Sequence, residues 1–277
     1  MYESHWGLKS LPFLAKIDSD SYYPSESHQA ASLKLHYAIE QRRSVAVICG
    51  EPGLGKTMLL ESCLAQLPEH ISPIAKVVFP AMPPDQLLRF VVRQIGPVET
   101  KTEHDVSLSI ETLERFLRHN LAEGNHAVIA IDEAHMLEQY GSLEPLRLIL
   151  NLAGDACETE SPLTLVLAGG TTLISHIAKH SSLEDRVAVR CHLERFSLDD
   201  SVAYVQHRLR YSGCNRENIF SGKALEQLHL LTQGVPRRIN RLCDLALMIG
   251  FAQDLKNIEA RTILSAHSEL SSQRQAA

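Results

Sequence analysis

A glycine-rich stretch between two apolar segments contains the residues with the clearest chemistry. Residues 50–57 read GEPGLGKT and match the phosphate-binding pattern G-x-x-x-x-G-K-[ST] in full. The glycines allow successive backbone N–H groups to point at phosphate oxygens, Lys56 would reach the β- and γ-phosphates, and the Thr57 hydroxyl would ligate Mg²⁺. We therefore expect ATP and Mg²⁺ to be bound by this loop, formed by Gly50, Glu51, Pro52, Gly53, Leu54, Gly55, Lys56, Thr57 and Met58.

Two carboxylates follow a second apolar segment, in the sequence VIAIDEAH at residues 128–135. A magnesium–nucleotide site needs a carboxylate at the end of a neighbouring buried strand, and Asp132 has this place. Glu133 could orient an attacking water and remove its proton. Such a pair could also simply close a turn, but the phosphate-binding loop in the same chain favours a hydrolytic site. His135, two residues further, is expected to be structural.

Hydrolysis also requires positive charge near the γ-phosphate, and a neighbouring subunit often supplies it as an arginine. The segment LEDRVAVRCHL, residues 183–193, offers Arg186 and Arg190. Farther along, the segment GVPRRINRL, residues 234–242, puts Arg237 at the start of a predicted helix. Ordinary surface charge is the alternative for all three arginines.

Thr171 is a further candidate, because it follows the apolar segment 162–170. From the end of a buried strand its hydroxyl could bind the γ-phosphate or the attacking water. Capping of the next helix would explain the residue equally well.

Apolar segments alternate with segments of helical periodicity up to about residue 196. Alternation of this kind favours parallel strands joined by crossover helices, so we predict an α/β fold with a parallel sheet flanked by helices. The expected strands are 44–50, 74–79, 125–135 and 162–170, and the expected helices are 25–43, 55–67, 83–96, 107–124 and 142–154. Only helical patterns follow, at 197–213, 221–234, 236–253 and 257–270.

This change of pattern predicts two domains, a nucleotide-binding core at 1–195 and a small all-helical domain at 196–277.

The chain has a net charge of −6, whereas residues 201–277 carry 10 Lys and Arg against 6 Asp and Glu. Such a balance does not favour a general DNA-coating protein but allows a local anion-binding face. No apolar segment approaches the roughly 18 residues that span a bilayer, and the first residues lack a signal-peptide pattern, so we expect a cytoplasmic protein.

The motifs together resemble those of the AAA+ ATPases, a class of P-loop NTPases. They follow the same order: a P-loop, an Asp-Glu pair ending a strand, an arginine pair at the domain edge, and a G-x-P-R helix start in a helical domain. The likeness narrows to the ExeA/GspA family, bacterial ATPases of secretion and pilus assembly. It covers nearly the whole chain and depends on the segments MYESHWGLKSLPF, IDEAHML, LEPLRLILNL and GVPRRINRLCDLAL.

The resemblance implies roles for several residues. Arg237 is similar to the sensor-2 arginine, Thr171 lies near the sensor-1 position, and Arg186 or Arg190 is similar to an arginine finger acting in trans. A nucleotide-dependent homo-oligomer is therefore implied. The opening segment packs near the adenine in this family, which makes candidates of three further residues whose types also suit core packing: Tyr22, Tyr23 and His28.

Two departures from the family pattern matter. Typical members have a glutamine where this chain has Gly170, which leaves the sensor-1 contact open. Longer members continue into a membrane helix and a peptidoglycan-binding domain, whereas this chain stops at Ala277. We therefore expect a short form that reaches the inner membrane only peripherally, through a membrane-anchored secretion or pilus partner.

Two other functions compete with this interpretation. A DNA-associated ATPase that regulates transposition, of the MuB, TniB or TnsC type, would use the basic C-terminal part to contact phosphate backbones. Steeply salt-dependent DNA binding would support this alternative, and its absence would contradict it. A small-molecule kinase is disfavoured by Glu133, because phosphoryl transfer to an acceptor needs no water-activating glutamate.

Overall fold

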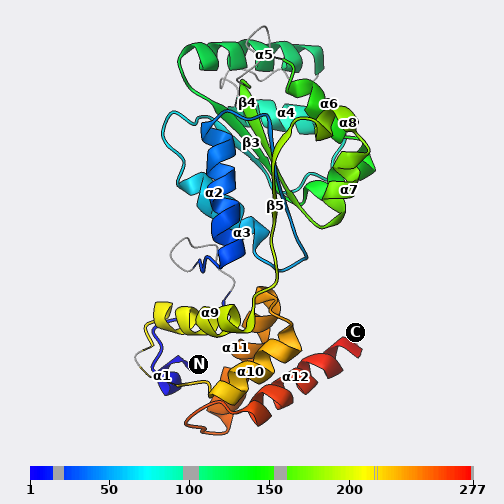
Figure 1. Cartoon of the computed structure of the whole chain (residues 1–277). Helices are drawn as coiled ribbons and strands as arrows, with labels where there is room; N and C mark the ends of the chain where they lie inside the picture. Colours follow the sequence, from blue (N-terminus) through cyan, green and yellow to red (C-terminus); the bar gives the residue numbers. More distant parts are fainter. Residues whose placement is uncertain (15–21, 96–105, 153–160, 215, 217, 276–277) are drawn as a thin grey trace. The chain divides into compact units, whose positions relative to one another are not determined.

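The computed structural model describes residues 1–14, 22–95, 106–152, 161–214, 216 and 218–275 (Figure 1). The chain divides into two compact units. Unit 1 contains Met1–Ser25, Gly53–Met58 and Glu194–Ala277, and unit 2 contains Glu26–Pro52 and Leu59–Leu193. Each unit is therefore built from separate stretches of the sequence.

Unit 2 is built around a sheet of five parallel strands in the order β2-β3-β4-β1-β5. The predicted α/β fold with a parallel sheet is confirmed. Strands β1, β3 and β4 are buried at every position, because both faces of the sheet are covered, and this explains their continuous apolar sequences. The strands are β1 Val45–Cys49, β2 Ile74–Val77, β3 Ala127–Ile131, β4 Leu163–Gly169 and β5 Val187–His192.

The sequence pattern does not predict strand β5. This strand lies at one edge of the sheet, and its residues alternate between half-buried and exposed before the buried Cys191. Arg190 stands at one of the exposed positions. An edge strand covered on fewer sides keeps fewer apolar residues, so its sequence lacks the continuous apolar run that identifies the inner strands.

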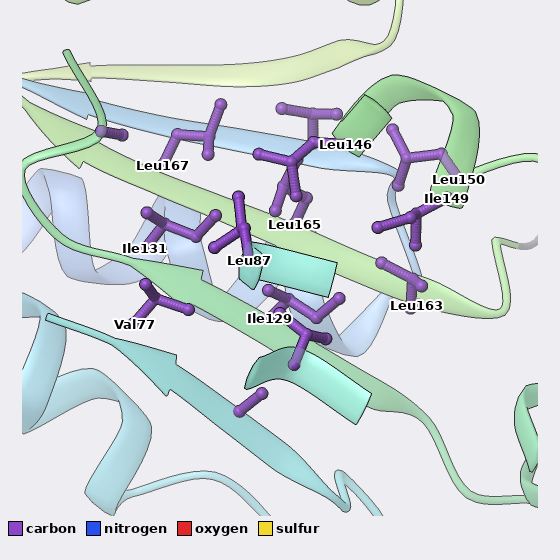
Figure 2. Packing of buried hydrophobic residues seen from close by; sticks show 14 of the residues in the cluster. Val77, Leu87, Ile129, Ile131, Leu146, Ile149, Leu150, Leu163, Leu165 and Leu167 are labelled. Carbon is purple, nitrogen blue, oxygen red and sulfur yellow. The ribbon is translucent and has the colours of Figure 1, made fainter. Parts of the chain in front are cut away.

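Helices cover the sheet of unit 2 (Figure 1). Helix α2 lies against β1 and β5, and α4 lies against β2. Figure 2 shows the cluster on one face, where Leu87 of α4 and Leu146 of α6 pack on strand residues such as Ile129. The helices are α2 Glu26–Glu40, α3 Lys56–Ala65, α4 Pro84–Ile95, α5 Val106–Ala122, the 3₁₀ helix η2 Ala134–Tyr140, α6 Leu143–Ile149, α7 Thr172–Ala178 and α8 Ser181–Glu184.

Unit 1 is helical and has its own hydrophobic cluster. Helix α9 begins with a capping box, in which the Ser197 side chain and the Asp200 side chain bind each other's backbone N–H groups. No helix in the described part of the chain is long and apolar enough to cross a membrane. The helices of unit 1 are α1 Glu3–Trp6, α9 Leu198–Tyr211, α10 Gly222–Thr232, α11 Pro236–Ala252 and α12 Ala260–Gln275.

The first residues of the chain pack with the C-terminal helices inside unit 1. Trp6 is fully buried, and its Nε1 donates to the carbonyl oxygen of Leu247 at 3.0 Å. A Cβ atom at Gly250 would lie 2.7 Å from the Trp6 ring, so the glycine makes room for it. The domain boundary that the sequence predicts at residue 195 would place the first residues in the nucleotide-binding core. The contacts of Trp6 place these residues in unit 1 instead, because the helices of unit 1 enclose the indole ring.

A buried histidine lies at the start of β3 in unit 2. His126 Nε2 donates to Thr164 Oγ1 at 2.8 Å, because the Thr164 hydroxyl itself donates to the carbonyl oxygen of Arg43. His126 Nδ1 has no hydrogen-bond partner among the described residues. Burial, with smaller contributions from Arg42 and His70, lowers the pKa of His126 to about 4. This histidine is therefore neutral at pH 7.

Acidification should destabilise unit 2 through His126. An unfolded histidine titrates near 6.5, so between this pH and about 4 only the unfolded chain takes up the proton. The free energy of unfolding should therefore be unaffected by His126 above pH 7 and fall by about 3 kcal/mol as the pH drops to 4. Urea unfolding at a series of pH values measures this dependence. His126→Gln should flatten it and the exposed control His119→Gln should not, so equal slopes in all three proteins would contradict the assignment.

Candidate nucleotide-binding site

Three strands of unit 2 end at the same edge of the sheet, and candidate residues follow each of them. Strand β1 leads into Gly50, β3 leads into Asp132, and β4 leads into Gly170. The register pairs Cys49 with Gly169 and Ile131 with Leu167, so these carboxyl ends lie side by side. Since β4 lies between β1 and β3, the residues after β4 stand between the other two groups.

The glycine-rich loop has the backbone that its sequence predicts. Gly53 and Gly55 have φ of 88° and 96°, values that favour glycine, and α3 begins immediately at Lys56. Lys56 and Leu54 are buried, with 7% and 2% of their surface exposed. The positive end of α3 and the lysine therefore follow the turn directly, an arrangement suited to binding phosphate.

Arg237 lies beside this turn within unit 1, to which Gly53–Met58 belongs. The Arg237 N–H donates to the carbonyl oxygen of Gly53 at 3.2 Å, and a Cβ atom at Gly53 would lie 2.9 Å from Arg237 Cβ. The close approach explains a glycine at this position. Arg237 is exposed, and its guanidinium makes no hydrogen bond or ion pair within the described part of the chain.

Asp132 and Glu133 differ in their surroundings. Asp132 is 6% exposed, its N–H donates to the carbonyl oxygen of Val77, and its Oδ1 accepts the N–H of Glu133 at 2.8 Å. Glu133 has φ of 49° and ψ of 33°, a left-handed conformation that is uncommon for residues other than glycine. Its side chain is 52% exposed. Asp132 is thus fixed and enclosed, as a metal ligand would be, and Glu133 projects from a constrained backbone.

Thr171 is exposed at the carboxyl end of β4, directly before α7. It occupies the N-cap position of that helix, yet its side chain makes no capping hydrogen bond. The Thr171 side chain therefore does not cap α7 in this structure. Its hydroxyl is exposed and could bind a ligand.

Arg186 and Arg190 do not lie at the carboxyl edge of the sheet. Arg186 precedes β5, whose first residue Val187 pairs with Val45 at the amino end of β1, and Arg190 pairs with Val47 in mid-strand. The Arg186 guanidinium donates to Asn151 Oδ1, and the Arg190 guanidinium forms an ion pair with Glu184 at 2.9 Å.

The tyrosine and histidine candidates from the opening segment take part in packing. The Tyr23 ring stands edge-on to Phe196 and Tyr204, with centroids 5.7 and 5.8 Å away. His28 is buried in α2, with 2% of its surface exposed. Tyr22 is half-buried. Their role as adenine contacts stays a prediction.

His135, which we expect from its sequence pattern to be structural, contacts two of the candidate segments. Its Nδ1 lies 3.4 Å from Glu133 Oε2 and accepts the N–H of Gly170 at 3.3 Å. Its spacing of two residues after the glutamate was visible in the sequence. The contact with the end of β4 was not visible, because it joins residues 35 positions apart.

Comparisons with known proteins agree with this geometry. The AAA domain family matches residues 39–176. General secretion pathway protein A of Aeromonas hydrophila is 34% identical over 274 residues, which cover 98% of this chain and 49% of that protein. The chain therefore spans about half the length of this curated relative.

Solved structures share the fold at low sequence identity. The ORC2 protein of Aeropyrum pernix, solved as ADPNP–ADP complexes, has a TM-score of 0.64 and 16% identity over 93% of this chain and 71% of its own. The ORC1 protein of the same organism, solved in complex with DNA, has a TM-score of 0.66 and 15% identity over 94% of this chain and 68% of its own. With the parallel sheet, the P-loop and the match to General secretion pathway protein A, the chain belongs to the ExeA/GspA family of AAA+ proteins.

Proposed function

We propose that this chain binds ATP with Mg²⁺, hydrolyses it, and uses the cycle to drive or regulate the assembly of a bacterial secretion or pilus system. One observation carries the enzymatic part of the proposal. The P-loop and the Asp132-Glu133 pair follow strands that end at the same sheet edge, with Thr171 after the strand between them. Binding of phosphate, metal and attacking water at one edge is what nucleotide hydrolysis requires.

Each residue would have a distinct task. The loop N–H groups and Lys56 would bind the phosphates, and Thr57 and Asp132 would hold the metal. Glu133 would take the proton from the attacking water. Bound Mg²⁺ would neutralise charge on the β- and γ-phosphate oxygens. The exposed residues Thr171 and Arg237 would contact the γ-phosphate side of the nucleotide.

The biological role is supported by the relative from Aeromonas hydrophila, whose name assigns it to general secretion. Because this chain spans about half of that protein, its partners are part of the proposal. We propose a nucleotide-dependent homo-oligomer, located in the cytoplasm, that meets a membrane-anchored secretion or pilus protein at the inner membrane. Deleting the gene in its host should stop secretion or pilus formation. Normal secretion and piliation would contradict this role and favour the alternative in transposition.

Removal of the metal tests the enzymatic part directly. The purified chain should release phosphate from ATP in the presence of Mg²⁺, because the metal offsets the charge that develops on the phosphate oxygens. Excess EDTA should abolish release, and added Mg²⁺ should restore it. The measurement should cover a range of protein concentrations, since a shared site would become active only on assembly. Release at the same rate with and without EDTA would contradict the metal assignment.

Arginine substitution should reveal whether the site is shared between subunits. In their own subunit, Arg186 and Arg190 lie away from the strand ends that lead into the site, so a contact with the γ-phosphate requires a neighbouring copy. Arg186 is the stronger candidate, because it binds a neutral amide and keeps its charge, whereas Glu184 partly neutralises Arg190. Arg186→Ala should lower ATP turnover about 10³-fold, the range of an arginine finger.

A mixing experiment separates action in trans from loss of structure. Arg186→Ala subunits keep Glu133, and Glu133→Gln subunits keep Arg186, so an assembly of both should contain some complete sites. Phosphate release should therefore rise when the two inactive proteins are combined. Arg190→Ala is the matched control and should change turnover less. If phosphate release did not recover in the mixture, this result would argue against a shared site. If Arg190→Ala lost more turnover than Arg186→Ala, Arg190 would be the arginine finger and Arg186 the control.

A further inference from the structure

One nitrogen of His135 faces two groups that cannot both bind it in the same protonation state. His135 Nδ1 accepts the backbone N–H of Gly170 at 3.3 Å, which requires a lone pair on that nitrogen. The Glu133 carboxylate oxygen Oε2 lies 3.4 Å from the same nitrogen and would need an N–H there. The imidazole therefore binds the end of β4 in one state and the glutamate in the other.

The backbones around this nitrogen are closely fixed. A Cβ atom at Gly169 would lie 3.0 Å from the His135 backbone nitrogen, so the end of β4 packs directly on the residues after Glu133. Asp132 Oδ1 binds the N–H of Glu133 and helps to hold its left-handed conformation. What remains adjustable is the Glu133 side chain, which is 52% exposed. Within the described part of the chain, His135 is the side chain that contacts its carboxylate.

We propose that His135 is a positioning residue for Glu133. The proposal rests on the proposed function of Glu133 as the group that activates water. By binding the carboxylate through Nδ1, the imidazole restricts a long side chain that otherwise moves in solvent. By exchanging the glutamate for the Gly170 N–H, it also couples the position of Glu133 to the end of β4, which leads to Thr171.

A purely packing role fits the structure less well. The His135 side chain is 34% exposed, so it is not part of the fully buried core. A Cβ atom at Gly170 would lie 3.8 Å from the ring, which is ordinary contact rather than tight packing. The polar contacts of Nδ1, not the volume of the ring, are therefore what a substitution should disturb.

Three substitutions of His135 in the full chain test this role. Asparagine places amide atoms close to the position of Nδ1 and can both donate and accept, whereas glutamine places its amide one bond further away. His135→Ala should lower kcat for ATP about tenfold, because the catalytic group loses its fixed position, and leave the KM and the dissociation constant for ATP unchanged. His135→Asn should restore most of the rate, and His135→Gln should not.

A double substitution shows whether the effect passes through the glutamate. In a Glu133→Gln background, His135→Ala should cause no further loss, because the group that it positions is already absent. Unchanged kcat in His135→Ala, equal rates for the asparagine and glutamine variants, or a full additional loss in the double variant would each overturn the proposal.

The same measurements separate this proposal from the proposed function. If wild-type turnover were absent, the hydrolytic function itself would fail. If Glu133→Gln were fully active, the proposed role of Glu133 in hydrolysis would fail. If Glu133→Gln were inactive and His135→Ala were as active as the wild type, only the role of His135 would fail.

Discussion

Replacing Glu133 by glutamine should lower the ATP turnover number at least about 100-fold while the protein still binds ATP. A general base contributes about 10² to 10⁴ in rate, and the amide cannot accept the proton of water. Binding should persist because Glu133 is half-exposed and belongs to neither the P-loop nor the set of metal ligands that we propose. Phosphate release at saturating ATP measures the first effect, and calorimetric titration with ATP measures the second.

A nearby carboxylate provides the matched control. Glu138 lies in the same helix η2 that follows Glu133, but it pairs with Lys179 and His180. Although burial opposes the shift, hydrogen bonds from Lys179 and His180 hold the pKa of Glu138 below its usual value. Glu138→Gln should therefore weaken an ion-pair network and leave turnover close to the wild-type rate. Equal turnover in the Glu133→Gln protein would remove Glu133 from the mechanism.

The Glu133→Gln protein should also accumulate as an ATP-bound assembly. If ATP favours association and hydrolysis reverses it, a chain that binds without hydrolysing remains associated. Light scattering with ATP should give a larger mass for this variant than for the wild type after the same incubation. If the mass of both proteins were the same with and without ATP, this result would argue against nucleotide-dependent assembly.

Substitution of Lys56 should act on binding rather than on turnover alone. Lys56 is buried at the first position of α3, so its charge is placed where water screens it little. Charge-assisted hydrogen bonds contribute about 1.5–3 kcal/mol, so Lys56→Ala should weaken ATP binding about 10- to 100-fold. Calorimetric titration with ATP measures the dissociation constant.

Two controls keep this result specific. Lys56→Met preserves the length of the buried side chain and should lose as much affinity as alanine, because charge rather than volume is responsible. The exposed Lys223 in α10 is the matched lysine elsewhere, and Lys223→Ala should bind ATP normally. If Lys56→Met bound ATP as tightly as the wild type, Lys56 would have no role in phosphate binding.

The features predicted well from the sequence are those determined by neighbouring residues. The P-loop is a continuous eight-residue pattern, and the inner strands carry uninterrupted apolar runs because they are covered on both faces. Helices α9 and α11 begin at a capping box and at a proline, both of which are local signals. The predicted boundaries of these elements accordingly lie within a few residues of the observed ones.

Features that depend on distant contacts were not predictable in the same way. Strand β5 is defined by its partner β1, and its alternating pattern alone is weak. Helices α7 and α8 are too short to show a periodic pattern. The grouping of Trp6 with α11, and the bond between His135 and Gly170, each join residues far apart in the chain. Such contacts leave no local signal in a single sequence.

The contact between Trp6 and Leu247 has a consequence for the order in which the protein is made. The ribosome synthesises a protein from its N-terminal towards its C-terminal end, and segments fold as their partners emerge. Unit 2 is complete once residue 193 has emerged, whereas Trp6 is made well before its partner in α11, which follows 241 residues later. During this interval the indole is without its partner, so a segment that is synthesised early becomes buried late.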